Sequence, residues 1–379
     1  MRKMVNLFDE ALNLLRARRV EFVDRFIPYY LCSYACHLIN LENRKRHFYY
    51  EHDRLPDLRL HVLMTAPAGF SKSFFLKQLL HPVYGLLNDG GVPMHFEGYC
   101  TEAGFIGSVE RVAGQVVKIK GLAEEYKDGI IGIEEFFAIM QAMEQKHSLH
   151  YEPALNQALI DGDVRKRLRG GSIEYKTNIT LWAGTQSTRF KVGGGLLRRF
   201  LLINWVPKRW EQKALKSALW AGVNLKLEEE KLQDFHDLLT AWRMALSRVE
   251  SVEFTEDFRD LVMPVEHFRQ PILMKLGIGY WLLLDDPQEK LVVDHDERLA
   301  HYIDQANEWW EELVGDPECN VVLEVLRDLG GVASWQALKR HLLRFSISYS
   351  KSDELIRLLI RRGEIEYESR NRLLRLKEG

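Results

Sequence analysis

Apolar residues recur along this chain in two different rhythms, and the change between them predicts where helices and strands lie. In residues 5–45 they recur every three or four positions, as they do in amphipathic helices. Four short apolar runs then end in polar or glycine residues, at 60–65, 130–133, 179–183 and 201–205. Short apolar strands that alternate with helices, such as the one expected from Ser73 to about Leu80, indicate a parallel sheet and an α/β fold.

The second half of the chain shows a different order of elements. From 210 to 315 the pattern is helical throughout, and we expect no strand there. After a break at Pro317, three helical stretches precede two short alternating runs, which is the pattern of a winged helix. We therefore expect four parts: an N-terminal helical segment, an α/β core, a helical lid and a winged-helix domain, at 1–55, 56–210, 211–315 and 316–379.

Composition and charge limit the class of protein. The chain has 379 residues, of which 46% are hydrophobic and 28% are charged, and its formal net charge is −2. These values are typical of globular proteins with more than one domain. Because the chain as a whole does not attract polyanions, any contact with nucleic acid has to come from a local basic patch.

The spacing of the cysteines and the composition of the N-terminal segment indicate the cellular compartment in which the protein is expected. The four cysteines lack the spacing of a zinc site, so we expect buried free thiols in a reducing compartment. The charged N-terminal segment has no apolar signal core, and no apolar run reaches ~18 residues. We therefore expect a cytoplasmic protein with no membrane partner.

The first candidate site is the loop that follows the run 60–65. A phosphate-binding loop needs small residues whose N–H groups surround phosphate oxygens, a lysine for the β- and γ-phosphates, and a hydroxyl for Mg²⁺. Lys72 and Ser73 supply the last two, while Ala66 and Ser71 stand where the strict pattern has glycines. The loop predicts ATP and Mg²⁺ as ligands, with an accidental Ser-Lys-Ser as the alternative. Its residues are Ala66, Pro67, Ala68, Gly69, Phe70, Ser71, Lys72 and Ser73.

Polar residues at the ends of the later strands are the second group of candidates. Glu134 and Glu135 follow the run 130–133; we expect the first to hold Mg²⁺ and the second to polarise the attacking water. Thr185 is placed to orient that water, and Arg199 to neutralise charge in the transition state. Each is also an ordinary surface residue at a strand end when taken alone, and it is their order along the chain that favours an ATPase.

A basic run at 164–171 is the candidate nucleic-acid contact. Its cations are Arg165, Lys166, Arg167 and Arg169, and two glycines permit the backbone of a hairpin tip. Such a tip suits sequence-blind, salt-sensitive contact with phosphates, and a solvated basic turn is the alternative. The mildly basic segment 316–379 is left open between binding DNA and docking a protein.

Together these segments resemble the AAA+ core of the minichromosome maintenance (MCM) helicases over roughly residues 55–315. Residues 266–276 resemble the family's lid helix, which puts the sensor 2 role at Arg269. The chain departs from the family at Ala66, where the family has Gly, and at Glu134, where it has Asp. The other matching segments are 60–79 with Walker A, 100–109 with the stretch before the helix-2 insert, 120–140 with Walker B, 155–185 with the presensor hairpin and sensor 1, and 196–203 with the arginine finger.

The resemblance implies a fold and an assembly. The fold is an AAA+ P-loop NTPase core with a parallel sheet, an α-helical lid and a C-terminal winged helix. The assembly is a homo-oligomeric ring, expected to be a hexamer, with ATP at the subunit interfaces. One subunit would contribute Lys72, Ser73, Glu134, Glu135 and Thr185, and its neighbour Arg199 and Arg269. Residues 1–55 do not match the family's N-terminal zinc and OB-fold region, so we expect a truncated relative.

The function expected from these observations is an ATP-driven DNA translocase or helicase. It would act on single-stranded or forked DNA in the replication of a virus, plasmid or other mobile element, alongside other replication proteins. An AAA+ loader or remodelling switch without unwinding activity is the alternative. A non-catalytic ATP-binding subunit of a larger ring is a third hypothesis.

Overall fold

The computed structural model describes most of the chain. The chain forms two compact units, Met1–Ala306 and Asn307–Gly379, each with a buried apolar core. The residues described are 6–46, 49–50, 53–54, 57–67, 72–112, 115–137, 139, 151–160, 162–168, 171–186, 197–206, 209–221, 229–314, 317–345, 347–362, 364–368 and 372–376.

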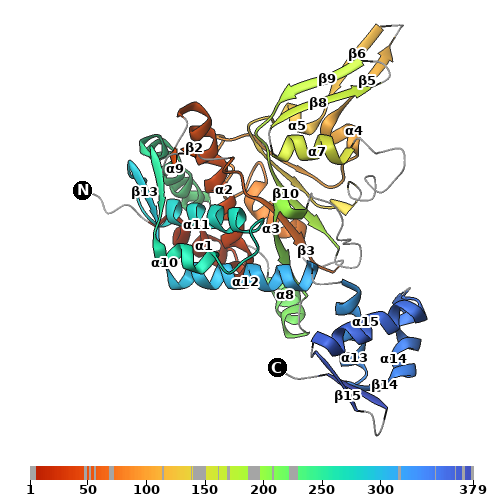
Figure 1. The fold of residues 1–379 in the computed structure, drawn as a ribbon. Coiled ribbons are helices and arrows are strands. Elements are labelled where there is room, and N and C mark those ends of the chain that lie inside the picture. The colour runs from red at the N-terminus through yellow and green to blue at the C-terminus, as the bar shows by residue number, and fades with distance from the viewer. Residues whose placement is uncertain are drawn as a thin grey trace. The chain divides into compact units, whose positions relative to one another are not determined.

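The first unit is built on a five-stranded parallel sheet with the order β11-β3-β10-β7-β4 (Figure 1). All four strands expected from the apolar runs are present, and each is buried at every position, as in a sheet covered on both faces. The α/β fold is therefore confirmed. The strands are β3 (His61–Thr65), β4 (Met94–Glu97), β7 (Ile130–Ile133), β10 (Thr180–Thr185) and β11 (Phe200–Asn204).

The N-terminal helices belong to the core of this unit. Helix α2 (Val23–Arg46) packs along α11 (Gln270–Leu284), with α1 (Leu7–Ala17) and α9 (Glu229–Ala245) beside them (Figure 1). A Cβ on Gly279 of α11 would lie 2.3 Å from the Cys32 carbonyl oxygen, so only glycine permits this close approach. The predicted domain boundaries at 55, 210 and 315 stay predictions.

The expectation of no strand between 210 and 315 is wrong. Strands β12 (Ser251–Phe254) and β13 (Lys290–Val293) pair in parallel. Strand β12 also pairs in parallel with β1 (Tyr49–Tyr50), and β1 pairs antiparallel with β2 (Asp53–Arg54). Both β12 and β13 alternate between buried and less buried positions, but over four residues only. So short an alternation does not stand out from the helices around it.

Two antiparallel hairpins extend from the first unit (Figure 1). One pairs β5 (Gly107–Val112) with β6 (Gln115–Lys120), and the other pairs β8 (Asp163–Leu168) with β9 (Gly171–Lys176). The second is the hairpin predicted from the basic run and its glycines. The other helices described in this unit are α3 (Lys72–Leu80), α4 (Glu102–Ile106), α5 (Leu122–Glu125), α7 (Tyr151–Leu159), η3 (Leu197–Arg199), α8 (Arg209–Ala221), η5 (Leu246–Arg248), α10 (Glu256–Val262) and α12 (Glu297–Val314), whose last residues belong to the second unit.

The second unit contains the three helices and the terminal hairpin expected from the sequence. It also contains β14, which was not predicted and which completes an antiparallel sheet of order β14-β16-β15. Its elements are α13 (Pro317–Asp328), β14 (Val332–Ser334), α14 (Trp335–Leu342), η6 (Leu343–Phe345), α15 (Tyr349–Arg362), β15 (Ile365–Glu368) and β16 (Leu373–Leu376). Across the described part of the whole chain, no helix is both long and apolar enough to cross a membrane.

A buried arginine joins several segments of the first unit just before β3. The Arg59 guanidinium is 1% exposed and pairs with Asp57, with Nε 2.7 Å from its Oδ2. Burial alone would raise the pKa of Asp57, but Arg59 outweighs this and holds it below its usual range. Three further donations reach the carbonyl oxygens of Ala158 (3.0 Å), Ile160 (3.0 Å) and Ile179 (2.9 Å).

Two buried histidines also connect the sheet to its surroundings. His37 lies between the Thr180 hydroxyl (2.9 Å) and the Asp128 carbonyl (3.1 Å). His61 accepts from the Leu181 N–H (3.0 Å) and donates to the Leu159 carbonyl (2.9 Å). Because a carbonyl only accepts, each ring carries a proton on Nε2. Burial lowers the pKa of His37 to about 4 and that of His61 to about 3.

We expect Arg59→Met to lower the free energy of unfolding by about 3–5 kcal/mol, because it removes one partner of a buried ion pair and three satisfied donations. Urea unfolding measures the change. The control is Arg16→Ala, whose ion pair with Asp24 is exposed and is worth at most about 1 kcal/mol. Equal effects of the two substitutions would show that the Arg59 network does not stabilise the fold.

We expect the first unit to lose stability as the pH falls from 7.5 to 5. Both histidines have lower pKa values in the folded chain than in the unfolded chain. Below pH ~6.5 the unfolded chain therefore binds more protons, which costs about 2 kcal/mol of stability per histidine at pH 5. Urea midpoints across this range test it. His37→Asn should remove about half of the pH dependence, because His61 remains, whereas the same change at exposed His301 should leave it intact.

Candidate active site

The polar residues predicted at the strand ends meet at one edge of the parallel sheet. Thr185 is the register partner of Thr65, and Ala183 is the partner of Ile133, so β3, β10 and β7 end side by side. The Ala66 N–H donates to the Thr185 carbonyl oxygen at 3.2 Å. The strand order places Thr185 between the predicted phosphate loop and the two glutamates, which lie far apart in the sequence.

The backbone around the two glutamates is fixed from both neighbouring strands. The Glu134 N–H donates to the Glu97 carbonyl (2.9 Å), and the Phe136 N–H donates to the Gly184 carbonyl (2.8 Å). A Cβ at Gly184 would lie 2.7 Å from the Glu134 carbonyl oxygen, so a glycine is needed where the turn crosses β10. Both carboxylates therefore leave the sheet from a rigid turn.

Helix α3 brings the lysine and the hydroxyl of the predicted loop to this turn. The Ser73 hydroxyl donates to the Glu134 carboxylate. Lys72 is 6% exposed, and its Nζ donates to the Ala66 carbonyl at 3.2 Å. Burial lowers the pKa of Lys72, against the opposing charges of Glu135 and Glu134. The loop residues Ala68, Gly69, Phe70 and Ser71 lie outside the described residues, and Pro67 lies at their border.

Two buried oxygens at this edge lack partners within the described part of the chain. They are Thr185 Oγ1 and Glu135 Oε2. The other Glu135 oxygen accepts from Gln186 Nε2 at a long 3.4 Å. Buried polar atoms in proteins are nearly always paired, so unpaired ones in a cluster mark a place for a ligand or water. The sequence-based analysis did not single out Gln186; its signal is its place one residue beyond the end of β10.

The two predicted arginines form a second group with contacts of its own. Arg199 is exposed in η3, while Arg269 precedes α11, is 5% exposed and pairs with Glu266 at 2.8 Å. The guanidinium of Arg198 lies 4.9 Å from the centre of the Phe268 ring. Because Arg198 and Phe268 are their sequence neighbours, this contact holds the η3 turn against the start of α11.

The residues of the first group suit Mg²⁺ with a phosphate ligand. Within the described residues, no cluster of three or more His, Cys, Asp or Glu forms a complete metal site. Mg²⁺ in nucleotide sites instead takes one or two protein oxygens, with substrate phosphates and waters as its other ligands. Ser73 and Glu134, already in contact, offer a hydroxyl and a carboxylate of this kind.

The basic hairpin presents its cations on two different faces. Arg165 and Arg167 are exposed, and Arg165 pairs with Asp163 at 2.8 Å. Lys166 lies on the opposite face of β8, is 12% exposed and pairs with Glu102 of α4. This follows from the alternation of side chains along a strand. Arg169, at the tip, lies outside the described residues.

Comparison with known proteins adds no relative to this picture. No protein-family model matches the chain, and no curated protein sequence matches it. The fold and the site together define an α/β protein with a five-stranded parallel sheet and a polar cluster at the carboxyl ends of its strands. The resemblance to the MCM helicases stays a prediction from sequence motifs.

We expect Thr185→Val to change the free energy of unfolding by less than about 1 kcal/mol, because it removes a buried hydroxyl that has no partner among the described residues. The matched control is Thr65→Val on the neighbouring strand. Thr65 is equally buried, but its hydroxyl donates to Asn204 at 2.7 Å, so its loss should cost about 1–3 kcal/mol. Equal destabilisation in urea unfolding would mean that the Thr185 hydroxyl is satisfied.

Proposed function

We propose that the chain binds Mg²⁺-ATP at the carboxyl edge of the five-stranded sheet and hydrolyses it. The observation that carries the proposal is that Lys72 and Ser73 of α3 lie beside Glu134, which follows β7. Ser73 and Glu134 are 61 residues apart in the sequence and are hydrogen-bonded to each other. A hydroxyl that touches a carboxylate beside a buried lysine is the arrangement expected of a phosphate site with a metal. Thr185 and Glu135, each with a buried oxygen that has no partner among the described residues, lie at the same edge.

Each residue has a part in binding or in moving a proton. The Lys72 ammonium stabilises the negative charge of the β- and γ-phosphates. Ser73 and Glu134 would hold Mg²⁺, which when bound neutralises charge on the phosphate oxygens. The Glu135 carboxylate accepts a proton from the attacking water, while Gln186 and the Thr185 hydroxyl position that carboxylate and water.

We further propose that the chain works as an AAA+ ring of the MCM type, with an α-helical lid and a C-terminal winged helix. The separate grouping of Arg199 and Arg269 around the start of α11 supports their action on the ATP of a neighbouring subunit. Arg199 is exposed, as a residue that reaches into another subunit needs to be. In this assembly the chain contributes one group of residues to each of two sites.

The work that ATP drives is proposed to be translocation along single-stranded or forked DNA. The β8–β9 hairpin supports this through the exposed cations Arg165 and Arg167, with Arg169 at the tip. Lys166 would have to leave Glu102 to join them. The second candidate is an ATP-dependent loader or switch without unwinding activity. The direct Ser73–Glu134 contact favours it, because the longer Glu134 side chain at the expected Asp position holds the hydroxyl itself.

An ATPase assay on wild type and two single variants tests the shared site. We expect Lys72→Ala and Arg199→Ala each to reduce turnover about 100-fold or more, since each removes a charge that stabilises the transition state. Mixing the two inactive proteins should restore part of the activity, because some interfaces then combine an intact Lys72 with an intact Arg199. Arg248→Ala, at a similarly exposed arginine, is the control.

DNA separates the two candidate functions in the same assay. A translocase should hydrolyse ATP faster with single-stranded DNA and should separate a fork, and the Arg165→Ser/Arg167→Ser variant should lose that stimulation. Lys213→Ser/Lys216→Ser removes two exposed charges from α8 as the matched control. Turnover without stimulation or strand separation favours the loader or switch. Absence of ATP turnover in wild type would contradict the proposed activity.

A further inference from the structure

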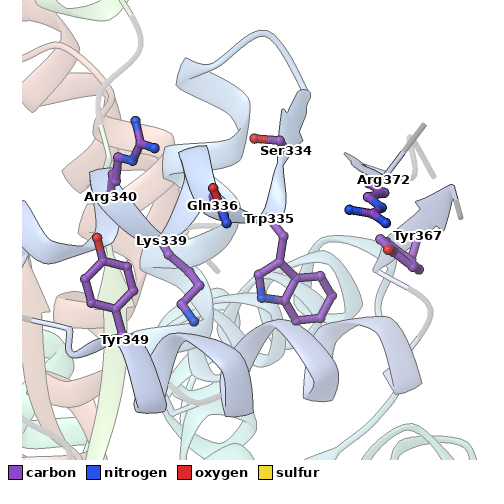
Figure 2. A pocket seen from close by; sticks show the side chains of 8 residues that line it. All are labelled: Ser334, Trp335, Gln336, Lys339, Arg340, Tyr349, Tyr367 and Arg372. Atoms are coloured by element: carbon purple, nitrogen blue, oxygen red, sulfur yellow. The ribbon is translucent and has the colours of Figure 1, made fainter.

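The second unit contains a pocket that the proposed ATPase does not use. It has a volume of about 740 Å³ and lies between α14, the beginning of α15 and the β15–β16 hairpin (Figure 2). Three aromatic rings and three cations are the side chains that matter in it: Trp335, Tyr349, Tyr367, Lys339, Arg340 and Arg372. The volume is in the range of sites that take small organic ligands.

The aromatic rings are fixed in place but remain open to a ligand. Trp335 donates from Nε1 to Asp353 of α15 at 2.6 Å, and its indole meets the Tyr367 ring edge-on, with centroids 5.7 Å apart. Tyr349 is 48% exposed and Tyr367 is 43% exposed. Exposed flat rings beside a cavity are platforms for another planar group.

The cations give the pocket a positive charge. Lys339 donates to Asp353 at 2.6 Å, and its Nζ also lies 5.1 Å from the centre of the Tyr349 ring. Arg340 and Arg372 are exposed, and none of the described residues that line the pocket is Asp or Glu. Asp353, next to the lining, offsets one of the three charges. Arg372 has a φ of 54°, a backbone conformation that costs less free energy for glycine than for arginine. A cation of the pocket therefore stands at a position where glycine would be more favourable.

The combination of rings and cations selects the ligand. An acidic peptide would contact the cations but not the aromatic rings. A duplex could not place its bases on the rings, because the faces of its bases are stacked on one another inside the helix. An unpaired nucleotide presents both a planar base and a phosphate. We propose that this pocket binds unpaired nucleotides of single-stranded nucleic acid. Tyr349 with Arg340, and Tyr367 with Arg372, lie on opposite sides of the pocket, and each pair offers a ring for a base and a cation for a phosphate (Figure 2). This site is separate from the β8–β9 hairpin and needs no ATP.

Photo-cross-linking of the full chain without ATP locates the bound strand. An oligo(dT) carrying 4-thiothymidine is irradiated with the protein, and mass spectrometry identifies the residues that become attached. We expect attachment at Trp335, Tyr349 or Tyr367, and competition by unlabelled oligo(dT) but not by a duplex of equal length. Attachment confined to residues 163–176, or no attachment at all, would overturn the proposal.

Two competitors separate the proposed strand from related ligands. If free dTMP competes as well as oligo(dT) at equal nucleotide concentration, the site takes free nucleotides and the strand proposal is wrong. If oligo-glutamate competes equally, the pocket binds acidic peptides instead, which also overturns it. Because the assay contains no ATP, a chain that lacks ATP turnover gives the same pattern, so this proposal and the proposed ATPase fail independently.

Matched variants assign the binding to the pocket. We expect Tyr349→Ala and Arg340→Gln each to reduce cross-linking at the pocket about 10-fold. The controls are Phe345→Ala and Arg344→Gln, which remove an equally exposed ring and cation of the neighbouring η6 that do not line the pocket. Equal losses in variants and controls would contradict the assignment. All four side chains are exposed, and unchanged urea midpoints would show that the variants fold.

Discussion

The rest of the first unit depends on the burial of one charge, the Arg59 guanidinium. A buried cation is tolerated only when a counter-ion and hydrogen-bond acceptors surround it. Here the acceptors are Asp57 and the carbonyl oxygens of segments that lead into β8 and β10. Because these segments continue to the basic hairpin and to Thr185, the arginine fixes where both begin relative to β3. The polar edge of the sheet is thus positioned partly from the opposite end of its strands.

The sequence predicted the strands whose side chains are buried on both faces of the sheet. Strands such as β7 and β11 read as continuous apolar runs because each side chain is buried. The edge strand β4, with the half-buried sequence Met-His-Phe-Glu, has no such run, and β12 and β13 are too short for their alternation to be visible. The Arg59 network was not predictable for another reason: apart from Asp57, its acceptors are backbone carbonyls, which every residue carries.

In the candidate site, too, the sequence predicted what depends on neighbouring residues but not what depends on contacts between distant segments. Glu134, Thr185 and Lys72 could be chosen because each follows an apolar run, and parallel strands end at a common edge. The sequence alone does not show that β10 lies between the loop and the glutamates, nor that Gln186 thereby meets Glu135. Lys166 illustrates the reverse: its place in a basic run suggested a free cation, but alternation along β8 turns it toward Glu102.

Helix α11 has a mechanical consequence for the arginines at its beginning. Arg269 and Phe268 lie at that beginning, Lys275 in its first half donates to the Arg59 carbonyl at 3.0 Å, and Gly279, one turn on, rests against α2. A closely packed helix such as α11, which contacts its surroundings at several positions, does not shift at one end alone. A displacement of the η3 turn would therefore be carried along α11 as a rigid body to the segment that precedes β3. The η3 turn and the segment before β3 lie at the same end of the sheet, because Phe200 is the register partner of His61, and α11 connects them a second time outside the sheet.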